Sequence, residues 1–276
     1  MQNAQKEMNL PFTMFVVSDL HLELCRTPID KYVRLIPDAD ILILAGDIGL
    51  PNKKHFVRFI KLCSESNKHK KILFIPGNHE YWSKFNDSQI KKACLDYNIN
   101  ILQNDMILID NIAFIGTTLW TNLTNLTKTQ HILTKMNDFN EIPEMNLQKW
   151  NSLHDQALKT IKYCLKKCSQ NNTKCIIITH HSPCIDCTYK YDHDKQINKC
   201  YFTDLSELFD HPNLLSWIFG HTHKTLCKLV GKNKETLLFG NSGRTRLEYN
   251  FKLKWFLEQN NIWNTKYVKD IKEYER

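Results

Sequence analysis

The feature that most restricts the fold of this chain is the alternation of short apolar runs with longer amphipathic stretches. Residues 40–45 read DILILA, a nearly continuous apolar run that is typical of a strand buried on both faces. Residues 51–66 instead space their apolar side chains like one face of a helix, with proline at the start. Strands that alternate with helices predict βαβ units and a largely parallel sheet.

The same patterns assign the other elements. Buried strands are predicted at Phe12–Val17, Asp40–Ala45, Lys71–Ile75, Lys174–Thr179 and Leu214–Phe219. Helices are predicted at Ile29–Ile36, Pro51–Ser66, Ser83–Tyr97 (with Ser83 as N-cap), Leu153–Cys168 and Asp204–Asp210. A hairpin is expected between Met106–Ile109 and Ile112–Gly116. An antiparallel set is expected to close the fold at Leu226–Val230, Thr236–Phe239 and Lys252–Phe256.

The domain organisation predicted from the sequence is simple. A length of 276 residues without a long linker predicts a single domain over residues 1–276. The segment 120–150 is rich in Asn and Thr and is interpreted as a cap or insertion. The polar segment 182–200 is interpreted as a second, loop-like insertion.

Targeting signals and cysteine usage indicate a reducing compartment. Residues 1–11 are polar and lack the apolar core of a secretory signal, and every apolar run is too short to span a bilayer. We therefore expect a cytoplasmic protein with no membrane span, whose ten cysteines are thiols. The pair Cys184-x-x-Cys187 leaves structural zinc as an alternative, which the lack of a matching second pair disfavours.

The net charge of +8 allows two interpretations. One is an acidic partner such as nucleic acid, and the other is a lysine-rich, solvated surface. We favour the second, because no stretch combines a dense basic run with the interleaved aromatic residues of a nucleic-acid-binding stripe.

Each of the five predicted buried strands is followed directly by polar residues of the metal-binding kind. These groups are Asp19-x-His21, Gly46-Asp47, Gly77-Asn78-His79-Glu80, His180-His181 and Gly220-His221-x-His223. In open α/β sheets the carboxyl ends of the strands form the ligand crevice, so the groups are predicted to converge. Three of the chain's eight glycines stand directly before such a group, where glycine lets the chain turn sharply off a strand.

The residue types in these groups indicate the chemistry. Asp, Asn and His suit manganese, iron, zinc and similar divalent ions, and no cysteine belongs to the set. One or two such side chains from each group, seven in all, are too many for one ion and fit two. Two ions about 3.5–4 Å apart can clamp a displacement at phosphorus, with a carboxylate that bridges them and a hydroxide as nucleophile.

Taken in this order, the five groups resemble the five-block signature of the calcineurin-like metallophosphoesterases, over residues 19–223. The segments Phe114–Trp120, Met136–Phe139 and Thr179–Pro183 resemble a bacterial-type branch of small metallophosphoesterases. The resemblance implies a four-layer α/β/β/α sandwich with mixed sheets and helices on the outer faces. It also implies hydrolysis of a small-molecule phosphomonoester or phosphodiester by a hydroxide that bridges two metal ions.

The resemblance also implies a role for each residue. The first metal would be held by Asp19, His21 and His223, and the second by Asn78, His180 and His221. Asp47 would bridge both metals, and His79 would act near the phosphate as general acid or stabilise charge on the leaving oxygen. Mn²⁺ is the expected metal in vitro, with Fe, Zn, Ni, Co and Mg as alternatives.

One departure from the wider superfamily concerns the second block. In the second block, phosphoprotein phosphatases have a pattern similar to Gly-Asp-x-x-Asp-Arg-Gly. Residues 46–51 of this chain have neither the second Asp nor the Arg. A protein Ser/Thr phosphatase is therefore not expected, and the sequence indicates no partner that would orient His79.

Two alternatives to a small-molecule phosphoesterase stay open. The first is a nuclease or other nucleic-acid-acting enzyme on the same two-metal scaffold. The second is a non-enzymatic protein that keeps the fold without the chemistry, which the filled ligand positions disfavour. The sequence indicates neither the physiological substrate nor the oligomeric state.

Overall fold

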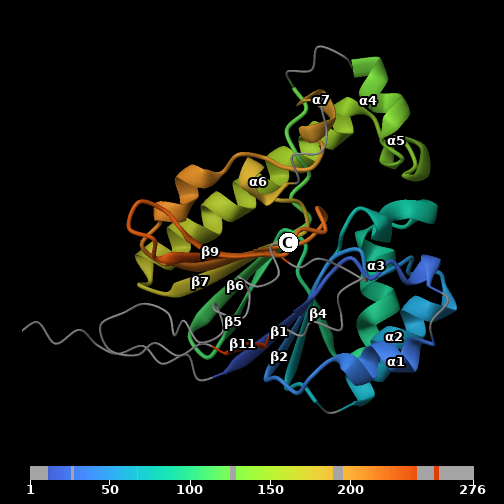
Figure 1. The fold of residues 1–276 in the computed structure, drawn as a ribbon, viewed down its shortest axis with the longest axis horizontal. Coiled ribbons are helices and arrows are strands. Elements are labelled where there is room, and N and C mark those ends of the chain that lie inside the picture. Colours follow the sequence, from blue (N-terminus) through green and yellow to red (C-terminus); the bar gives the residue numbers. More distant parts are fainter. Residues whose placement is uncertain are drawn as a thin grey trace, which may run out of the picture.

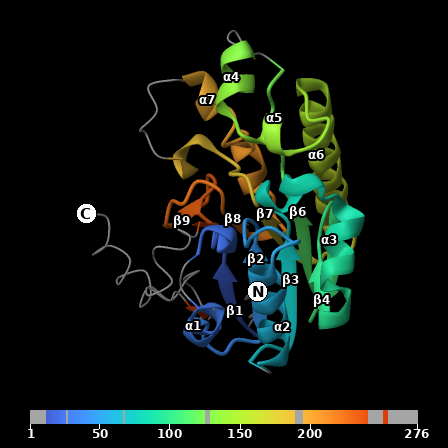
Figure 2. The ribbon, with the colours of Figure 1, turned by 90° about the vertical axis from the view of Figure 1, so that its right-hand side faces the viewer.

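The computed structural model describes residues 12–25, 28–66, 68–124, 129–188, 195–240 and 252–254. The strands form two sheets that pack face to face, and helices cover the outer face of each sheet (Figures 1 and 2). This is the four-layer α/β/β/α sandwich that the family resemblance implied, so the predicted fold class is confirmed.

The first sheet has the strand order β11-β1-β2-β3-β4. Strands β1 to β4 run parallel, and β11 pairs antiparallel with β1 at one edge. The strands are β1 (Thr13–Val17), β2 (Ile41–Ala45), β3 (Lys71–Ile75), β4 (Ile99–Ile101) and β11 (Lys252–Lys254). The sequence did not predict β4, because its three residues are only partly buried and carry no continuous apolar run.

The second sheet has the order β5-β6-β7-β8-β10-β9. Its strands are β5 (Asp105–Ile109), β6 (Ile112–Thr117), β7 (Lys174–Thr179), β8 (Leu214–Phe219), β9 (Leu226–Val230) and β10 (Thr236–Gly240). The predicted hairpin of β5 and β6 is confirmed. Asp110 and Asn111 at its turn have φ of 46° and 62°, the left-handed values that a type I′ turn requires.

The predicted antiparallel set at the end of the fold is wrong in its pairing. β9 and β10 are antiparallel to each other, but β10 also pairs parallel with β8. β11 belongs to the other sheet, where it pairs with β1. An apolar pattern indicates that a strand forms without indicating which strand it pairs with, so the sequence could not separate these partners.

Successive residues of the first-sheet strands point into different layers. In β1, Met14 and Val16 pack against the second sheet, whereas Phe15 and Val17 pack against helices. Burial of each such side chain stabilises the fold by about 1.5–3 kcal/mol. Burial on both faces explains why these strands are apolar at nearly every position.

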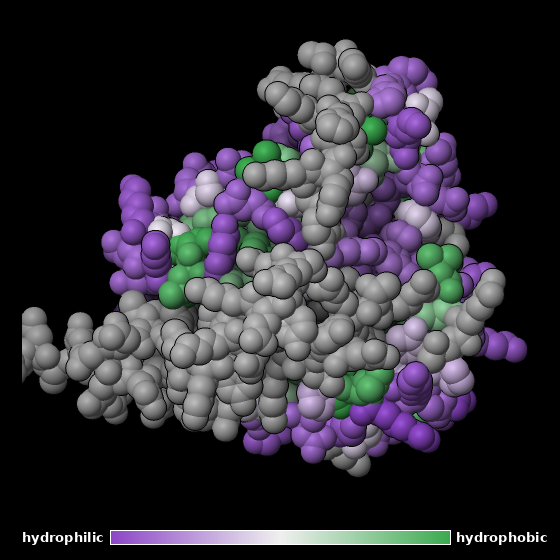
Figure 3. All heavy atoms as spheres, in the orientation of Figure 1, coloured by the Kyte–Doolittle hydropathy of each residue, from purple (hydrophilic) through white to green (hydrophobic). Residues whose placement is uncertain are grey.

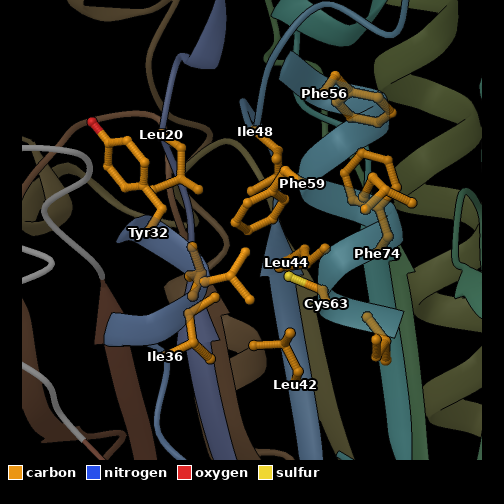
Figure 4. Close-up of a cluster of buried hydrophobic side chains, with 14 of the residues drawn as sticks. Leu20, Tyr32, Ile36, Leu42, Leu44, Ile48, Phe56, Phe59, Cys63 and Phe74 are labelled. Atoms are coloured by element: carbon orange, nitrogen blue, oxygen red, sulfur yellow. The ribbon is translucent and has the colours of Figure 1, made fainter. Parts of the chain in front are cut away.

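Helices α1 (Ile29–Leu35), α2 (Lys54–Glu65) and α3 (Asp87–Cys94) cover the first sheet. Figure 4 shows Phe56, Phe59 and Cys63 of α2 beside Leu44 of β2 and Phe74 of β3. On the other side, α6 (Leu147–Gln170) covers the second sheet. The helices therefore seal the two outer faces of the sheets and hold their strand ends in place.

Two predicted helix starts differ most from the structure. The helix expected from Ser83 begins only at Asp87, because Asn86 and Gln89 form a capping box there. The residues before it form the 3₁₀ helix η2 (His79–Lys84), and η3 (Leu95–Tyr97) follows α3. The helix expected to begin at residue 153 instead begins at residue 147, inside the segment that was interpreted as an insertion.

The segment 120–150 contains α4 (Thr129–Lys135) and α5 (Asp138–Glu141), and the polar segment 182–200 contains α7 (Lys195–Asn198). The three helices lie together at one end of the sandwich (Figures 1 and 2). We call them and their apolar cluster the cap, and the cluster consists of Trp120, Leu123, Ile132, Met136, Ile142, Met145, Trp150 and Cys200. The remaining 3₁₀ helices are η1 (Leu22–Leu24), η4 (Ile185–Cys187) and η5 (Ser206–Asp210).

On the face shown in Figure 3, the described residues are mostly hydrophilic, and hydrophobic residues form a few separate patches among them. Within the described parts of the chain, no helix has both the length and the apolar character needed to cross a membrane.

Candidate metal centre

The predicted site residues follow strands of both sheets. They are Asp19 and His21 after β1, Asp47 after β2, Asn78 and His79 after β3, His180 after β7, and His221 and His223 after β8. The strands are parallel to their neighbours within each sheet, so their carboxyl ends meet at one edge of the sandwich. The structure brings all eight side chains to this edge.

Several of these residues have unusual backbone conformations. Asp19, His21, Asp47, His221 and His223 all have φ between 45° and 64°. The left-handed region costs a non-glycine residue of order 1–3 kcal/mol, and such residues gather at functional sites. The left-handed conformation turns the backbone sharply after each strand, and the five side chains gather at the same edge of the sandwich.

The first group of ligand atoms belongs to Asp19, His21 and His223, and these atoms all lie within 4.8 Å of one another. The Nε2 atoms of His21 and His223 are 3.1 Å apart, and Nε2 of His223 lies 3.5 Å from Oδ1 of Asp19. Ligand atoms that bind one ion at about 2.0–2.2 Å are separated by about such distances. The three side chains are therefore spaced like ligands of a single ion.

The second group belongs to Asp47, His180 and His221. Nε2 of His180 lies 3.3 Å from Oδ2 of Asp47 and 3.1 Å from Oδ1 of Asn78. Nδ1 of His180 donates a hydrogen bond of 3.0 Å to the backbone oxygen of Ala45. This bond fixes the ring so that Nε2 faces the other ligand atoms, an arrangement common for metal-binding histidines.

The carboxylate of Asp47 joins the two groups. Its Oδ2 atom lies 3.3 Å from Nε2 of His180 in the second group and 3.8 Å from Nε2 of His21 in the first. Its Oδ1 atom accepts a hydrogen bond of 2.9 Å from the backbone N–H of His79. Asp47 is only 2% exposed, so its charge acts on the neighbouring imidazoles rather than on solvent.

His221 provides a test of whether these residues fit metal ions. Its Nε2 atom is buried and has no hydrogen-bond partner among the described residues. A buried polar atom without a partner costs about 1–3 kcal/mol, and a cation would satisfy it. Carboxylate, amide and imidazole donors are also those that divalent transition metals accept. The residues therefore fit two divalent ions.

The pKa values of the metal-free site show how its charges interact. Burial favours the neutral form of Asp47, but His180 and His79 outweigh burial and hold the pKa of Asp47 well below its usual value. Burial also opposes protonation of His180, yet Asp47 raises the pKa of His180 to about 10. Burial, with the neighbouring His181, lowers the pKa of His221 well below its usual value. Positive charge is thus favoured beside Asp47, where a metal ion would replace protons.

Two glycines let the loops approach one another at the site. Gly46 has φ of +87°, and a Cβ there would collide with the His180 ring and lie 2.8 Å from Cα of Gly77. A Cβ on Gly77 would collide with Oδ1 of Asp47 and lie 2.8 Å from Cε1 of His180. The predicted need for glycine before these two ligands is explained by the close approach of the loops.

Replacement of Gly77 by alanine is expected to weaken Mn²⁺ binding by at least about tenfold, because the added methyl group displaces Asp47 and His180. Overpacking should also lower the free energy of unfolding by about 1–3 kcal/mol. Chelator competition measures the first effect and thermal unfolding the second. Gly116→Ala is the matched control, because its methyl group would collide with Leu102, outside the site. Equal losses of metal affinity in the two variants would contradict this account.

His79 lies beside Asp47, with its Nε2 atom 3.8 Å from Oδ2 of the carboxylate. Its Nδ1 atom is 2.9 Å from Oε1 of Glu23, and its ring stacks on Trp82 at a centroid distance of 3.6 Å. Burial opposes protonation of His79, but Asp47 and Glu23 outweigh it and raise its pKa to about 9. The sequence did not indicate Glu23 or Trp82, because neither belongs to the five groups of polar residues that follow the buried strands.

Glu80 was quoted in the third block without a role, and the structure shows its contacts. Its buried carboxylate accepts backbone hydrogen bonds from Asp47 at 2.9 Å, Gly49 at 3.0 Å and Gly77 at 2.6 Å. Glu80 therefore ties the loop after β2 to the loop after β3.

Asp138 connects the cap to the site. This residue of α5 is 2% exposed, and its Oδ1 atom accepts hydrogen bonds from Nδ2 of Asn78 at 2.8 Å and from Nε1 of Trp82 at 3.0 Å. Because Nδ2 of Asn78 is engaged, Oδ1 of Asn78 points toward His180. The segment Met136–Phe139 was noted in the sequence, but its distance from Asn78 along the chain concealed this contact.

The Cys184 and Cys187 side chains belong to neither of these groups. Their Sγ atoms are 3.2 Å from each other, and both residues are buried. Among the described residues, no group spaced to hold a metal ion includes a cysteine. The described part of the chain therefore does not support the alternative of a structural zinc site.

A four-layer sandwich with two groups of Asp and His side chains at its strand ends defines the class of metallophosphoesterases. Residues 12–225 match the calcineurin-like phosphoesterase family, and the chain belongs to this family of hydrolases. The chain is also 31% identical over 245 residues to the uncharacterized protein L509 of Acanthamoeba polyphaga mimivirus, and the match covers 76% of this chain and 84% of that protein.

Solved structures share the fold. Phosphopantetheinyl hydrolase (PptH) from Mycobacterium tuberculosis superposes with a TM-score of 0.70 at 14% identity, over 90% of this chain and 97% of that chain. A dimetal phosphatase from Danio rerio superposes with a TM-score of 0.51 at 13% identity, over 84% of this chain and 88% of that chain. At these identities the likeness shows the fold alone.

Proposed function

We propose that this chain hydrolyses a small-molecule phosphomonoester or phosphodiester at a centre of two divalent metal ions. The observation that carries the proposal is the position of the Asp47 carboxylate, which lies between two groups of potential ligands. Mn²⁺ is proposed as the metal that supports activity in vitro, because carboxylate, amide and imidazole donors suit it.

The proposed ligand sets follow the two groups. One metal would be held by Asp19, His21 and His223, and the other by Asn78, His180 and His221, with Asp47 shared between them. When bound, such ions neutralise phosphate charge and lower the pKa of a water molecule enough for it to attack phosphorus at neutral pH.

The proposed role of His79 is that of general acid. Its Nδ1 atom faces Glu23, which leaves Nε2 on the side of Asp47. From there Nε2 would donate its proton to the leaving oxygen as the bond between that oxygen and phosphorus breaks. The oxygen of the attacking water would stay on phosphorus, and the leaving group would depart as an alcohol.

The test of this proposal combines a metal count with an activity assay. About two metal ions per chain are expected by mass spectrometry of the metal-loaded protein. Turnover of 4-nitrophenyl phosphate or bis-4-nitrophenyl phosphate should disappear after chelation and return with Mn²⁺.

A substrate panel then separates the remaining candidates. It contains nucleotides, cyclic nucleotides, sugar phosphates, phospholipid analogues and a phosphopantetheinyl compound, the last chosen from the name of the M. tuberculosis relative. DNA and RNA in the panel test the nuclease alternative. A fully metal-loaded protein that hydrolyses nothing in the panel would contradict the proposal.

Asp138→Ala is expected to weaken the second metal site by about 10–100-fold, because the Asn78 amide loses the partner that orients it. Isothermal titration with Mn²⁺ should show a loss confined to one of two binding events. Asp138→Asn keeps an acceptor oxygen and should lose less. Glu141→Gln is the control, since it lies on the same short helix with an exposed side chain. A uniform weakening of both binding events would indicate general damage to the cap instead.

A further inference from the structure

A general-acid histidine needs its ring held in one orientation with the proton on the nitrogen that faces the substrate. In phosphoprotein phosphatases the second block carries an additional Asp, which residues 46–51 of this chain lack. The partner of His79 must therefore come from another part of the structure.

Glu23 occupies the position that such a partner needs. It lies in η1, directly after β1, and its side chain is 9% exposed. Its Oε1 atom is 2.9 Å from Nδ1 of His79 and 3.5 Å from Nδ1 of His21. A carboxylate only accepts, so Nδ1 of His79 carries the proton in this bond.

The environment confines Glu23 and His79 on several sides. The other carboxylate oxygen of Glu23, Oε2, is buried and has no hydrogen-bond partner among the described residues, and a Cβ on Gly49 would lie 3.3 Å from it. The His79 ring stacks on Trp82 with an angle of 24° between the planes, and Trp82 in turn donates to Asp138. The ring of His79 is thus fixed in its plane by Trp82 and in its rotation by Glu23.

His21 is held from the same carboxylate oxygen. Its Nδ1 atom lies 3.3 Å from Nδ1 of His79, as expected when two N–H groups point at one acceptor. Its Nε2 atom faces His223 at 3.1 Å. Glu23 therefore contacts the Nδ1 side of both rings, that of the proposed metal ligand His21 and that of the proposed acid His79.

We propose that Glu23 is a positioning residue that sets the rings of both His79 and His21 through their Nδ1 atoms, so that both Nε2 atoms face the metal centre. This inference rests on the proposed function, in which His79 is the acid and His21 a ligand. It assigns to a residue of the first block the orientation of His79, for which residues 46–51 offer no second Asp.

The experiment compares two substrates that differ in leaving group. With saturating Mn²⁺, kcat is measured for 4-nitrophenyl phosphate, whose leaving group needs little protonation, and for phenyl phosphate, whose leaving group needs more. Glu23→Gln is expected to lower kcat for phenyl phosphate by about tenfold more than kcat for 4-nitrophenyl phosphate, because general acid catalysis contributes about 10²–10⁴-fold. In a His79→Ala background the same substitution should leave the ratio of the two substrates unchanged.

The contact between Glu23 and His21 is tested separately, by a measurement of Mn²⁺ affinity that does not depend on activity. Glu23→Ala should weaken Mn²⁺ binding in chelator competition by about 10–100-fold, as the loss of a partner behind a metal-binding histidine does. Glu23→Asp, which keeps the charge but not the reach, should restore neither property fully. Glu235→Gln is the control, since Glu235 is exposed on the turn before β10.

Different results would overturn different claims. An unchanged ratio of the two substrates in Glu23→Gln, with an active wild-type enzyme, overturns the positioning role and leaves the proposed function intact. A wild-type enzyme that hydrolyses neither substrate overturns the proposed function instead. A third metal ion that is present in the wild type and lost in Glu23→Gln would show that His21, Glu23 and His79 bind a cation themselves, and would also overturn the positioning role.

Discussion

Asp47→Ala is expected to abolish two-metal binding and phosphoesterase turnover together. Asp47 contacts ligands of both groups, at 3.3 Å from His180 and 3.8 Å from His21, so its loss removes the carboxylate that both metals would share. It also removes the negative charge that lies beside both His180 and His21. The electrostatic contribution of bound metals is worth several kcal/mol, so kcat/KM should fall by at least about 10³-fold.

Metal analysis by mass spectrometry and kinetics on the same preparation check this expectation. Asp47→Asn keeps the size of the side chain and an oxygen that can accept from the His79 backbone, and it therefore separates the charge of Asp47 from its packing. Asp155→Asn, an exposed position on α6, controls for the change of net charge. Substantial activity in a metal-free Asp47→Ala protein would refute the two-metal assignment.

His79→Ala is expected to retain both metals and to slow turnover by about 10²–10⁴-fold. His79 contributes its backbone N–H to Asp47, and this contact survives the substitution, so the ligand groups should stay in place. The lost ring removes only the proton donor on the side of the leaving oxygen. The effect should therefore fall mainly on kcat and should be larger for substrates with poor leaving groups.

Metal content, KM and kcat for two leaving groups decide whether this expectation holds. His55→Ala is a matched control, because Nδ1 of His55 donates a hydrogen bond of 3.2 Å to the backbone oxygen of Leu22 in η1 and His55 belongs to neither ligand group. If His79→Ala lost metal in proportion to activity, His79 would be a ligand and not the acid. If it slowed both substrates equally, the proton would come from another donor.

The Glu23 inference changes how the first block is understood. In the sequence, Asp19 and His21 stood out because each has a side chain that binds metals, whereas no pattern singled out Glu23. In the structure, the same turn supplies two proposed ligands and the carboxylate behind His79. The first block would then build both the metal centre and the acid.

Much of the fold was predictable because it depends on short-range patterns. The strands β1, β2, β3, β7 and β8 were predicted from nearly continuous apolar runs, since burial on both faces leaves few polar positions in them. The start of α3 was missed because the capping box of Asn86 and Gln89 outweighed an apolar spacing that continues upstream. The place of β10 between β8 and β9 was missed because strand pairing is a long-range choice.

The sequence by itself determined which residues end the buried strands, and therefore the donor types at the site, because side-chain chemistry and strand order are properties of the linear chain. Tertiary structure alone decided which side chains hydrogen-bond to these site residues. Asp138 reaches Asn78 from a cap 60 residues away, and Glu23 reaches His79 across 56 residues. Such contacts depend on how two sheets and a cap pack together, and a hydrogen bond between distant residues leaves no periodic mark in the chain.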